Sequence, residues 1–154
     1  MTRRKKSFKL SEKLLLLIPS IVGFVTSSIF LYATYIIESL PPGCYLNQEI
    51  LPGISIDCIK VFSSEYSSIF SIPFVVLAFV YFAIDIILNY LLILRRNNFL
   101  KNLIFTLRSI GIVFIPYLIY LEFFVINSLC IYCTIMQLMI LVNFVYFFKL
   151  RRNL

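Results

Sequence analysis

Long apolar stretches alternate with short polar ones along this chain. Four apolar stretches are long enough to cross a bilayer, which takes about 20 residues in a helix. They lie at about 14–37, 70–94, 109–126 and 129–148. A membrane-spanning barrel would instead show roughly ten-residue segments of alternating polarity. The pattern therefore predicts an all-α integral membrane protein, built as a bundle of four transmembrane helices.

The first apolar stretch follows the basic start MTRRKK, as in a signal peptide. It is longer than the roughly 7–15 apolar residues of a signal peptide, and no A-x-A-like cleavage site follows it. We therefore expect a retained helix.

The connection over residues 38–69 has the composition of a loop, because prolines and glycines are frequent in its first half. After Cys58, apolar residues recur at spacings of one, three and four. This spacing predicts a short amphipathic helix at the membrane interface, ahead of the second transmembrane helix. No internal repeat or second domain is evident, so we expect a single membrane domain over residues 1–154.

Composition agrees with a lipid environment, since 61% of the residues are hydrophobic and 14% are charged. Of the 14 basic residues, 13 flank the predicted helices on one side: Arg3, Arg4, Lys5, Lys6, Lys9, Lys13, Arg95, Arg96, Lys101, Arg108, Lys149, Arg151 and Arg152. The positive-inside rule then predicts a multi-pass protein of the cell membrane with both termini in the cytoplasm. The net charge of +7 reflects this topology, and we expect no nucleic-acid partner.

All four cysteines fall on the predicted extracytoplasmic side, where disulfides form and persist. Cys44 and Cys58 lie in the 38–69 connection, and Cys130 and Cys133 open the last helix. If that helix begins near Ser128, the pair lies in its first turn, where the helix dipole stabilises a thiolate. Four interpretations remain open: apolar packing, structural disulfides, a four-thiolate zinc site or a redox relay. The shared side and the CxxC spacing favour the relay, so we expect no metal.

A relay needs an electron acceptor, and the chain contains no histidine to ligate haem. It also lacks a flavin-binding fingerprint. A membrane bundle can offer an apolar pocket that is open to lipid. We therefore expect a quinone as the cofactor.

Residues 20–148 resemble the vitamin K epoxide reductase family, in its microbial, disulfide-forming branch. The stretch CIKVFSSEYSSIFSIPFVVLAFVYF is similar to the family's loop cysteine, its Val-(Leu/Phe)-Ser-Ser run and the Phe-Gly-Ile-Pro that opens helix two. A CxxC then opens the last helix, in the family's order. The resemblance implies a thiol:quinone oxidoreductase that drives disulfide formation.

By position, the resemblance assigns roles to the cysteines. Cys130 and Cys133 would be the active-site pair beside the quinone, with Cys133 the thiolate that gives up electrons. Cys44 and Cys58 would be a shuttle pair, in which Cys58 reaches Cys130 and Cys44 exchanges with a thioredoxin-like protein. Since no thioredoxin domain follows the last helix, that partner is expected to be a separate protein.

The resemblance also suggests two quinone contacts. Ser64 would bond a quinone oxygen or a thiolate, unless it only caps a helix. Gln137 takes the place of a tyrosine that touches the quinone in vertebrate members. The quinone is expected to be of the ubiquinone or menaquinone type. One alternative is an epoxide or quinone reductase whose main role is to make the reduced product. The other is a non-catalytic membrane protein with structural disulfides.

Two acids lie within apolar stretches, where an ionisable residue is a functional candidate. We expect Asp85 to pair with Asn89 or a nearby arginine rather than to carry protons. Glu122 could donate a proton to the quinone site, but we expect a solvated acid at the interface.

Overall fold

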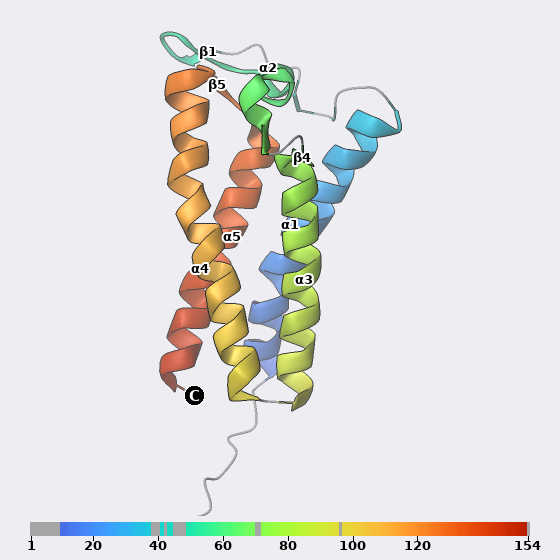
Figure 1. The fold of residues 1–154 in the computed structure, drawn as a ribbon, viewed down its shortest axis with the longest axis vertical. Helices are drawn as coiled ribbons and strands as arrows, with labels where there is room; N and C mark the ends of the chain where they lie inside the picture. Colours follow the sequence, from blue (N-terminus) through green and yellow to red (C-terminus); the bar gives the residue numbers. More distant parts are fainter. Residues whose placement is uncertain are drawn as a thin grey trace, which may run out of the picture.

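The structure is a computed structural model that describes residues 10–37, 41, 43–44, 49–69, 72–95 and 97–153. Its long helices are α1 (Leu10–Tyr35), α3 (Phe74–Arg95), α4 (Asn98–Tyr120) and α5 (Ile131–Asn153). A π-helical turn, η2 (Leu121–Val125), continues α4. Four helical spans are long and apolar enough to cross a membrane: Leu14–Tyr35, Phe74–Arg95, Asn98–Val125 and Ile131–Arg152. The predicted all-α membrane bundle is therefore confirmed (Figure 1).

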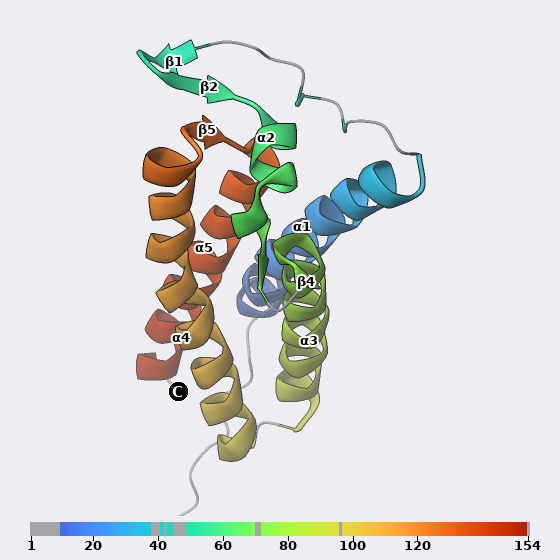
Figure 2. The ribbon, with the colours of Figure 1, turned by 45° about the horizontal axis from the view of Figure 1, so that its top comes forward.

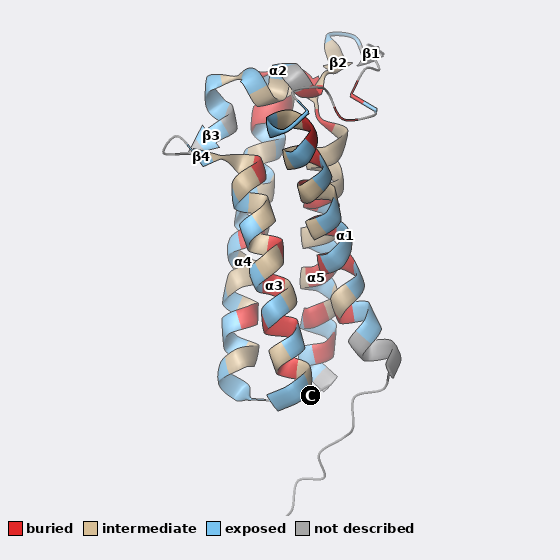
Figure 3. Ribbon diagram, turned by 90° about the vertical axis from the view of Figure 1, so that its right-hand side faces the viewer, coloured by how far each residue is buried: buried red, intermediate tan, exposed pale blue. Residues whose placement is uncertain are grey.

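The helices pack through a narrow apolar interior. α1 packs mainly against α3 and α5, while α4 packs against α5 and α3. Gly23 allows the close approach of α1 to α3, because a β-carbon at this position would collide with the ring of Phe82. Buried positions face neighbouring helices, whereas the outer surface carries large apolar side chains such as Val113 and Phe124 (Figure 3). Such an exterior suits lipid.

A buried polar network ties the four helices together away from the cysteines. Asp85 on α3 accepts hydrogen bonds from Arg108 Nε on α4 (3.0 Å), Asn89 Nδ2 (3.0 Å) and the hydroxyl of Ser20 on α1. Arg108 Nη1 donates to the carbonyl of Asn143 on α5 at 2.9 Å. Asp85 thus pairs with both Asn89 and an arginine, as predicted.

Arg108 corrects one sequence prediction. It was assigned to the cytoplasmic connection, and the third transmembrane helix was placed from about residue 109. The structure instead begins α4 at Asn98, after an Asn97 side chain that accepts the Phe99 N–H at 3.3 Å. Arg108 is therefore inside the helix and 0% exposed. It fits there because Asp85 neutralises its charge.

One end of the bundle carries a cap that the sequence predicted only in part (Figure 2). Strands β1 (Glu49–Leu51) and β2 (Ile54–Ile56) form a hairpin whose turn places Gly53 at φ 93°. β2 then pairs in parallel with β5 (Ser128–Leu129). The expected short helix is α2 (Cys58–Ser63), which begins at Cys58 itself. It is followed by η1 (Glu65–Ser67), β3 (Ser68–Ile69) and β4 (Ile72–Pro73).

The other end of the bundle carries most of the basic residues that the structure describes. The α3–α4 connection and the end of α5 lie together there, opposite the cap (Figure 1). Arg95, Lys101, Lys149, Arg151 and Arg152 belong to these segments. The basic positions 3–9 and Arg96 lie outside the described residues.

Candidate active site

All four cysteines meet in one buried cluster beneath the cap. They pack with apolar side chains of α1, α3 and α5, among them Phe30, Val75 and Met136. Three of the four are buried, and Cys133 is half-buried. The cysteine pairs come from segments far apart in the chain, so the fold brings them together as the relay interpretation requires.

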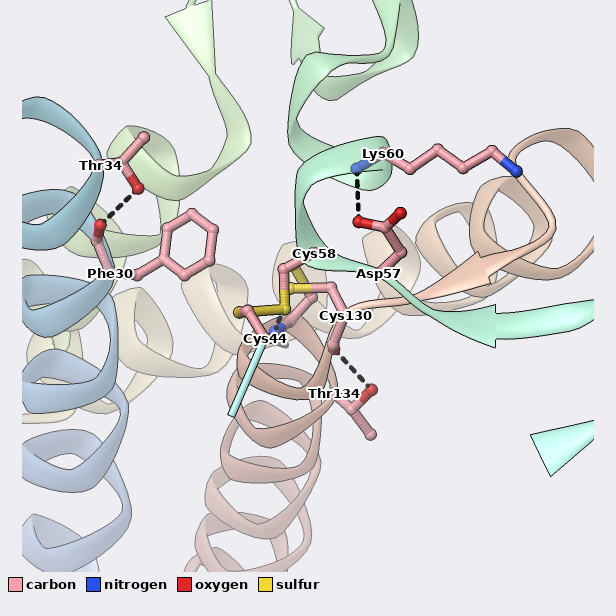
Figure 4. Close-up of a disulfide and its surroundings, with 9 residues drawn as sticks. Phe30, Thr34, Cys44, Asp57, Cys58, Lys60, Cys130 and Thr134 are labelled. Atoms are coloured by element: carbon pink, nitrogen blue, oxygen red, sulfur yellow. Dashed lines mark hydrogen bonds between the residues drawn. A yellow bond between two sulfur atoms is a disulfide. The ribbon is translucent and has the colours of Figure 1, made fainter. Parts of the chain in front are cut away.

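Backbone pairing places Cys58 beside Cys130. In the parallel β2–β5 pair, Ser55 lies opposite Ser128 and Ile56 opposite Leu129. The Asp57 N–H extends this pairing by donating to the Leu129 carbonyl at 3.2 Å. Each strand is then followed within two residues by its cysteine, and Figure 4 shows the side chains of Cys58 and Cys130 next to each other.

Asp57 also starts the helix that carries Cys58. Its carboxylate accepts the Lys60 N–H at 3.1 Å (Figure 4). Its carbonyl accepts the Val61 N–H at 3.4 Å. This is the hydrogen-bonding pattern of an N-cap. α2 therefore begins at a fixed point, and Cys58 has a defined direction.

A disulfide joins Cys44 to Cys58, with Cα atoms 5.4 Å apart. A tight turn precedes Cys44: its N–H donates to the Pro41 carbonyl at 3.2 Å, and Gly43 has φ 94°. Such a positive φ favours glycine. The turn delivers Cys44 to the buried cluster from a proline-rich segment.

Cys130 and Cys133 are free thiols. α5 begins at Ile131, two residues later than predicted, because Ser128 and Leu129 extend as β5. Cys130 thus precedes the helix, and its sulfur accepts the Cys133 N–H at 3.4 Å. Hydrogen bonding from Cys133 lowers the pKa of the Cys130 thiol, although burial acts in the opposite direction.

An apolar cavity of about 90 Å³ opens beside the inner thiols. Its wall comes from α1, the cap, α3, α4 and α5. Its polar or titratable side chains, apart from the disulfide-bonded Cys58, are Tyr66, Glu122, Cys130, Cys133 and Gln137. Aromatic wall residues include Phe30, Phe62 and Phe74.

The model of the Vitamin K epoxide reductase family matches residues 14–148. The chain belongs to this family. A comparison with curated proteins found no match. Membership implies oxidoreductase activity and supports quinone-linked disulfide redox chemistry in general.

The site of this vitamin K epoxide reductase family member suits an apolar acceptor. The cavity is lined almost entirely by apolar atoms, and both inner thiols reach it. Such a pocket with a few convergent polar groups is typical of small-molecule sites. Gln137, predicted as a quinone contact, lines the cavity and is 7% exposed.

Ser64 stays a predicted contact to a quinone or a thiolate, with a helix cap as the alternative. It is not among the residues that line the cavity. Its hydroxyl donates to the Val61 carbonyl at 2.8 Å and makes no cap hydrogen bond to η1. This side chain therefore stabilises the end of α2.

Glu122 corrects the prediction of a solvated acid. It is 4% exposed, lines the cavity and accepts a hydrogen bond from Gln137 Nε2 at 3.3 Å. The prediction rested on the position of Glu122 near the end of its helix, but Glu122 continues the buried face that carries Arg108 and Gly111. The sequence signal that pointed to Glu122 was an acid within an apolar stretch.

Proposed function

We propose that this protein is a membrane thiol:quinone oxidoreductase that drives disulfide formation in exported proteins. Its two cysteine pairs would pass electrons from a separate thioredoxin-like protein to a quinone of the ubiquinone or menaquinone type. The observation that carries this proposal is the meeting of Cys58 with Cys130 in one buried cluster, beside a cavity lined by both inner thiols. Positively charged residues at the opposite end favour cytoplasmic termini and an extracytoplasmic site.

The first exchange takes place at the outer pair. A thiolate of the partner attacks the sulfur of Cys44, which breaks the Cys44–Cys58 disulfide and releases the Cys58 thiolate. The partner's second thiol resolves the mixed disulfide and leaves Cys44 as a thiol. The partner thereby becomes oxidised, and the outer pair holds its two electrons.

The second exchange joins the two pairs. Cys58 attacks Cys130 of the oxidised inner pair, forming a Cys58–Cys130 disulfide and releasing Cys133. Cys44 then attacks Cys58, which closes the outer disulfide and releases Cys130. The result is a closed Cys44–Cys58 pair and two free inner thiols, and the structure has this combination.

The inner pair then passes two electrons and two protons to the acceptor in the cavity. When bound, a quinone supplies a two-electron, two-proton acceptor, and the apolar wall with Gln137 would hold its ring. Cys133 and Cys130 lose two electrons and two protons as they close to a disulfide, so atoms and charges balance. The cap covers the inner thiols and limits their contact with bulk water.

The test is quinone reduction by purified protein in detergent, with decylubiquinone and menadione as acceptors. We expect Cys133→Ala to abolish quinol formation, and Thr106→Ala, on the exposed surface of α4, to retain it. Cys44→Ala should still work with a small dithiol but fail with a thioredoxin-like protein. Equal inactivity of wild type and variants with both acceptors would overturn the proposal.

A further inference from the structure

Glu122 lies at the end of α4, in the π-helical turn η2, and is buried. The wide turn is closed by the Ile126 N–H, which donates to the Leu121 carbonyl at 2.9 Å, five residues back. π-helical turns inside α-helices are rare and are frequent at functional sites. The carboxyl group of Glu122 lines the same cavity as Cys130 and Cys133.

The two acids that are buried within the described part of the chain have opposite surroundings. Asp85 faces the guanidinium of Arg108, which balances its charge. Glu122 has no lysine or arginine among the residues that line its cavity. Within the described residues, the hydrogen bond it receives is the one from Gln137. An ionised carboxylate out of water costs several kcal/mol when partners do not compensate it, so this apolar site favours a carboxyl that carries its proton.

We propose that Glu122 is the proton-transferring residue of this site. This inference rests on the proposed function and adds a catalytic role for a residue of this chain. The carboxyl of Glu122 donates its proton to an oxygen of the acceptor held in the cavity. It regains a proton from the inner thiol pair.

The thiols supply the electrons and protons that the acceptor takes up. Closing the Cys130–Cys133 disulfide releases two electrons and two protons, and the acceptor takes up both. Glu122 gives one proton and receives one, so it ends each cycle in its starting state. No water or further proton donor is required.

Gln137 positions the carboxyl. Its amide nitrogen donates to Oε1 of Glu122, which leaves the second carboxyl oxygen for the proton. Both side chains line the cavity and also a groove between α4 and α5 on the membrane-facing side. The pair therefore lies where an acceptor from the lipid would come close to the thiols.

A purely structural role for Glu122 is the competing explanation. The hydrogen bond to Gln137 joins η2 to α5, so it could serve only to clamp these helices. Glu122→Gln separates the two roles, because an amide keeps the size and the hydrogen bond but cannot exchange a proton as a carboxyl does. Glu65→Gln, an exposed carboxyl-to-amide change in the cap, is the matched control.

The experiment is a single turnover of the full chain in detergent, reduced beforehand and mixed with decylubiquinone over a range of pH. We expect Glu122→Gln to slow quinol formation by roughly 10²–10⁴-fold, the usual contribution of a general acid. Glu122→Asp should recover part of the rate. Thermal unfolding should be unchanged in Glu122→Gln, and so should the affinity for decylubiquinone measured in a Cys133→Ala background.

The pH profile is the more specific readout. The other titratable groups facing Glu122 in the cavity are Tyr66, Cys130 and Cys133. In the wild type, the rate should rise as the thiols ionise and fall as Glu122 loses its proton. The falling limb should be absent in Glu122→Gln and present in Glu65→Gln.

Two results would overturn the inference alone. The first is a Glu122→Gln protein with wild-type rate and profile. The second is a loss of rate matched by an equal loss of decylubiquinone affinity or of thermal stability. A wild type that does not reduce decylubiquinone at all would instead defeat the proposed function, and this inference with it.

Discussion

Removing Asp85 should destabilise the bundle strongly, because Arg108 would be left as an unpaired charge in the membrane interior. Both side chains are 0% exposed, so solvent does not screen the pair. Asp85 accepts four hydrogen bonds: one from Ser20, one from Asn89 and two from Arg108. At roughly 0.6 kcal/mol for each such bond in a membrane protein, these account for about 2.4 kcal/mol.

The unpaired charge makes the total cost larger than that of the hydrogen bonds alone. Breaking a buried ion pair by removing one partner costs about 3–5 kcal/mol, whereas replacing both partners by apolar residues is often neutral. We therefore expect Asp85→Leu to lower the free energy of unfolding by about 3–5 kcal/mol. Asp85→Leu combined with Arg108→Leu should recover most of that loss.

The assay is unfolding of the purified protein by SDS titration in mixed micelles, for wild type, both single variants and the double variant. The double-mutant cycle isolates the pairwise energy. Additive losses, with no recovery in the double variant, would refute the reasoning. Quinol formation per folded molecule should be unchanged, since the pair lies away from the cysteines.

Two further predictions concern packing and the cap. Gly23→Val should lower the unfolding free energy by about 1–3 kcal/mol, because its side chain would displace Phe82 between α1 and α3. SDS titration would measure this loss. Gly23→Ala should lower the unfolding free energy by less. Asp57→Ala should remove the N-cap of α2, at a cost of about 1 kcal/mol, and slow electron transfer from Cys58 to Cys130. Hydrogen exchange of the α2 amides measures the first effect, and Asp57→Asn, which keeps the acceptor oxygen, should behave like wild type.

The sequence predicted the membrane-spanning helices because long apolar stretches in lipid leave the backbone few alternatives. It misplaced the start of α4 because a charged residue such as Arg108 is usually a sign of a loop beside a membrane helix. An arginine partner for Asp85 is predicted, but only the fold reveals that this partner is Arg108 on a different helix. Pairing across helices is not encoded in the local pattern around either residue.

The candidate site, like the fold, was predictable from the sequence only in part. The cysteines were recognisable from spacing and side, and Gln137 from its place after the CxxC. The cap strands were missed because elements of two or three residues are too short to show a period of two. Glu122 is expected in solvent because it lies near the end of its helix, and the local pattern does not show that the cap and α5 enclose it.

Because β2 pairs with β5 through the backbone, some segments near the cysteines tolerate changes of sequence or length in evolution and others do not. Main-chain hydrogen bonds align the two segments, so side chains in the hairpin can be replaced while the sulfurs stay in register. An insertion before Glu49 would only lengthen the approach from Cys44. One extra residue between Ile56 and Cys58, or between Leu129 and Cys130, would shift a sulfur by about 3.3 Å and turn it to the opposite face. Related chains should therefore vary in length on the Cys44 side of the hairpin and keep their length between each strand and its cysteine.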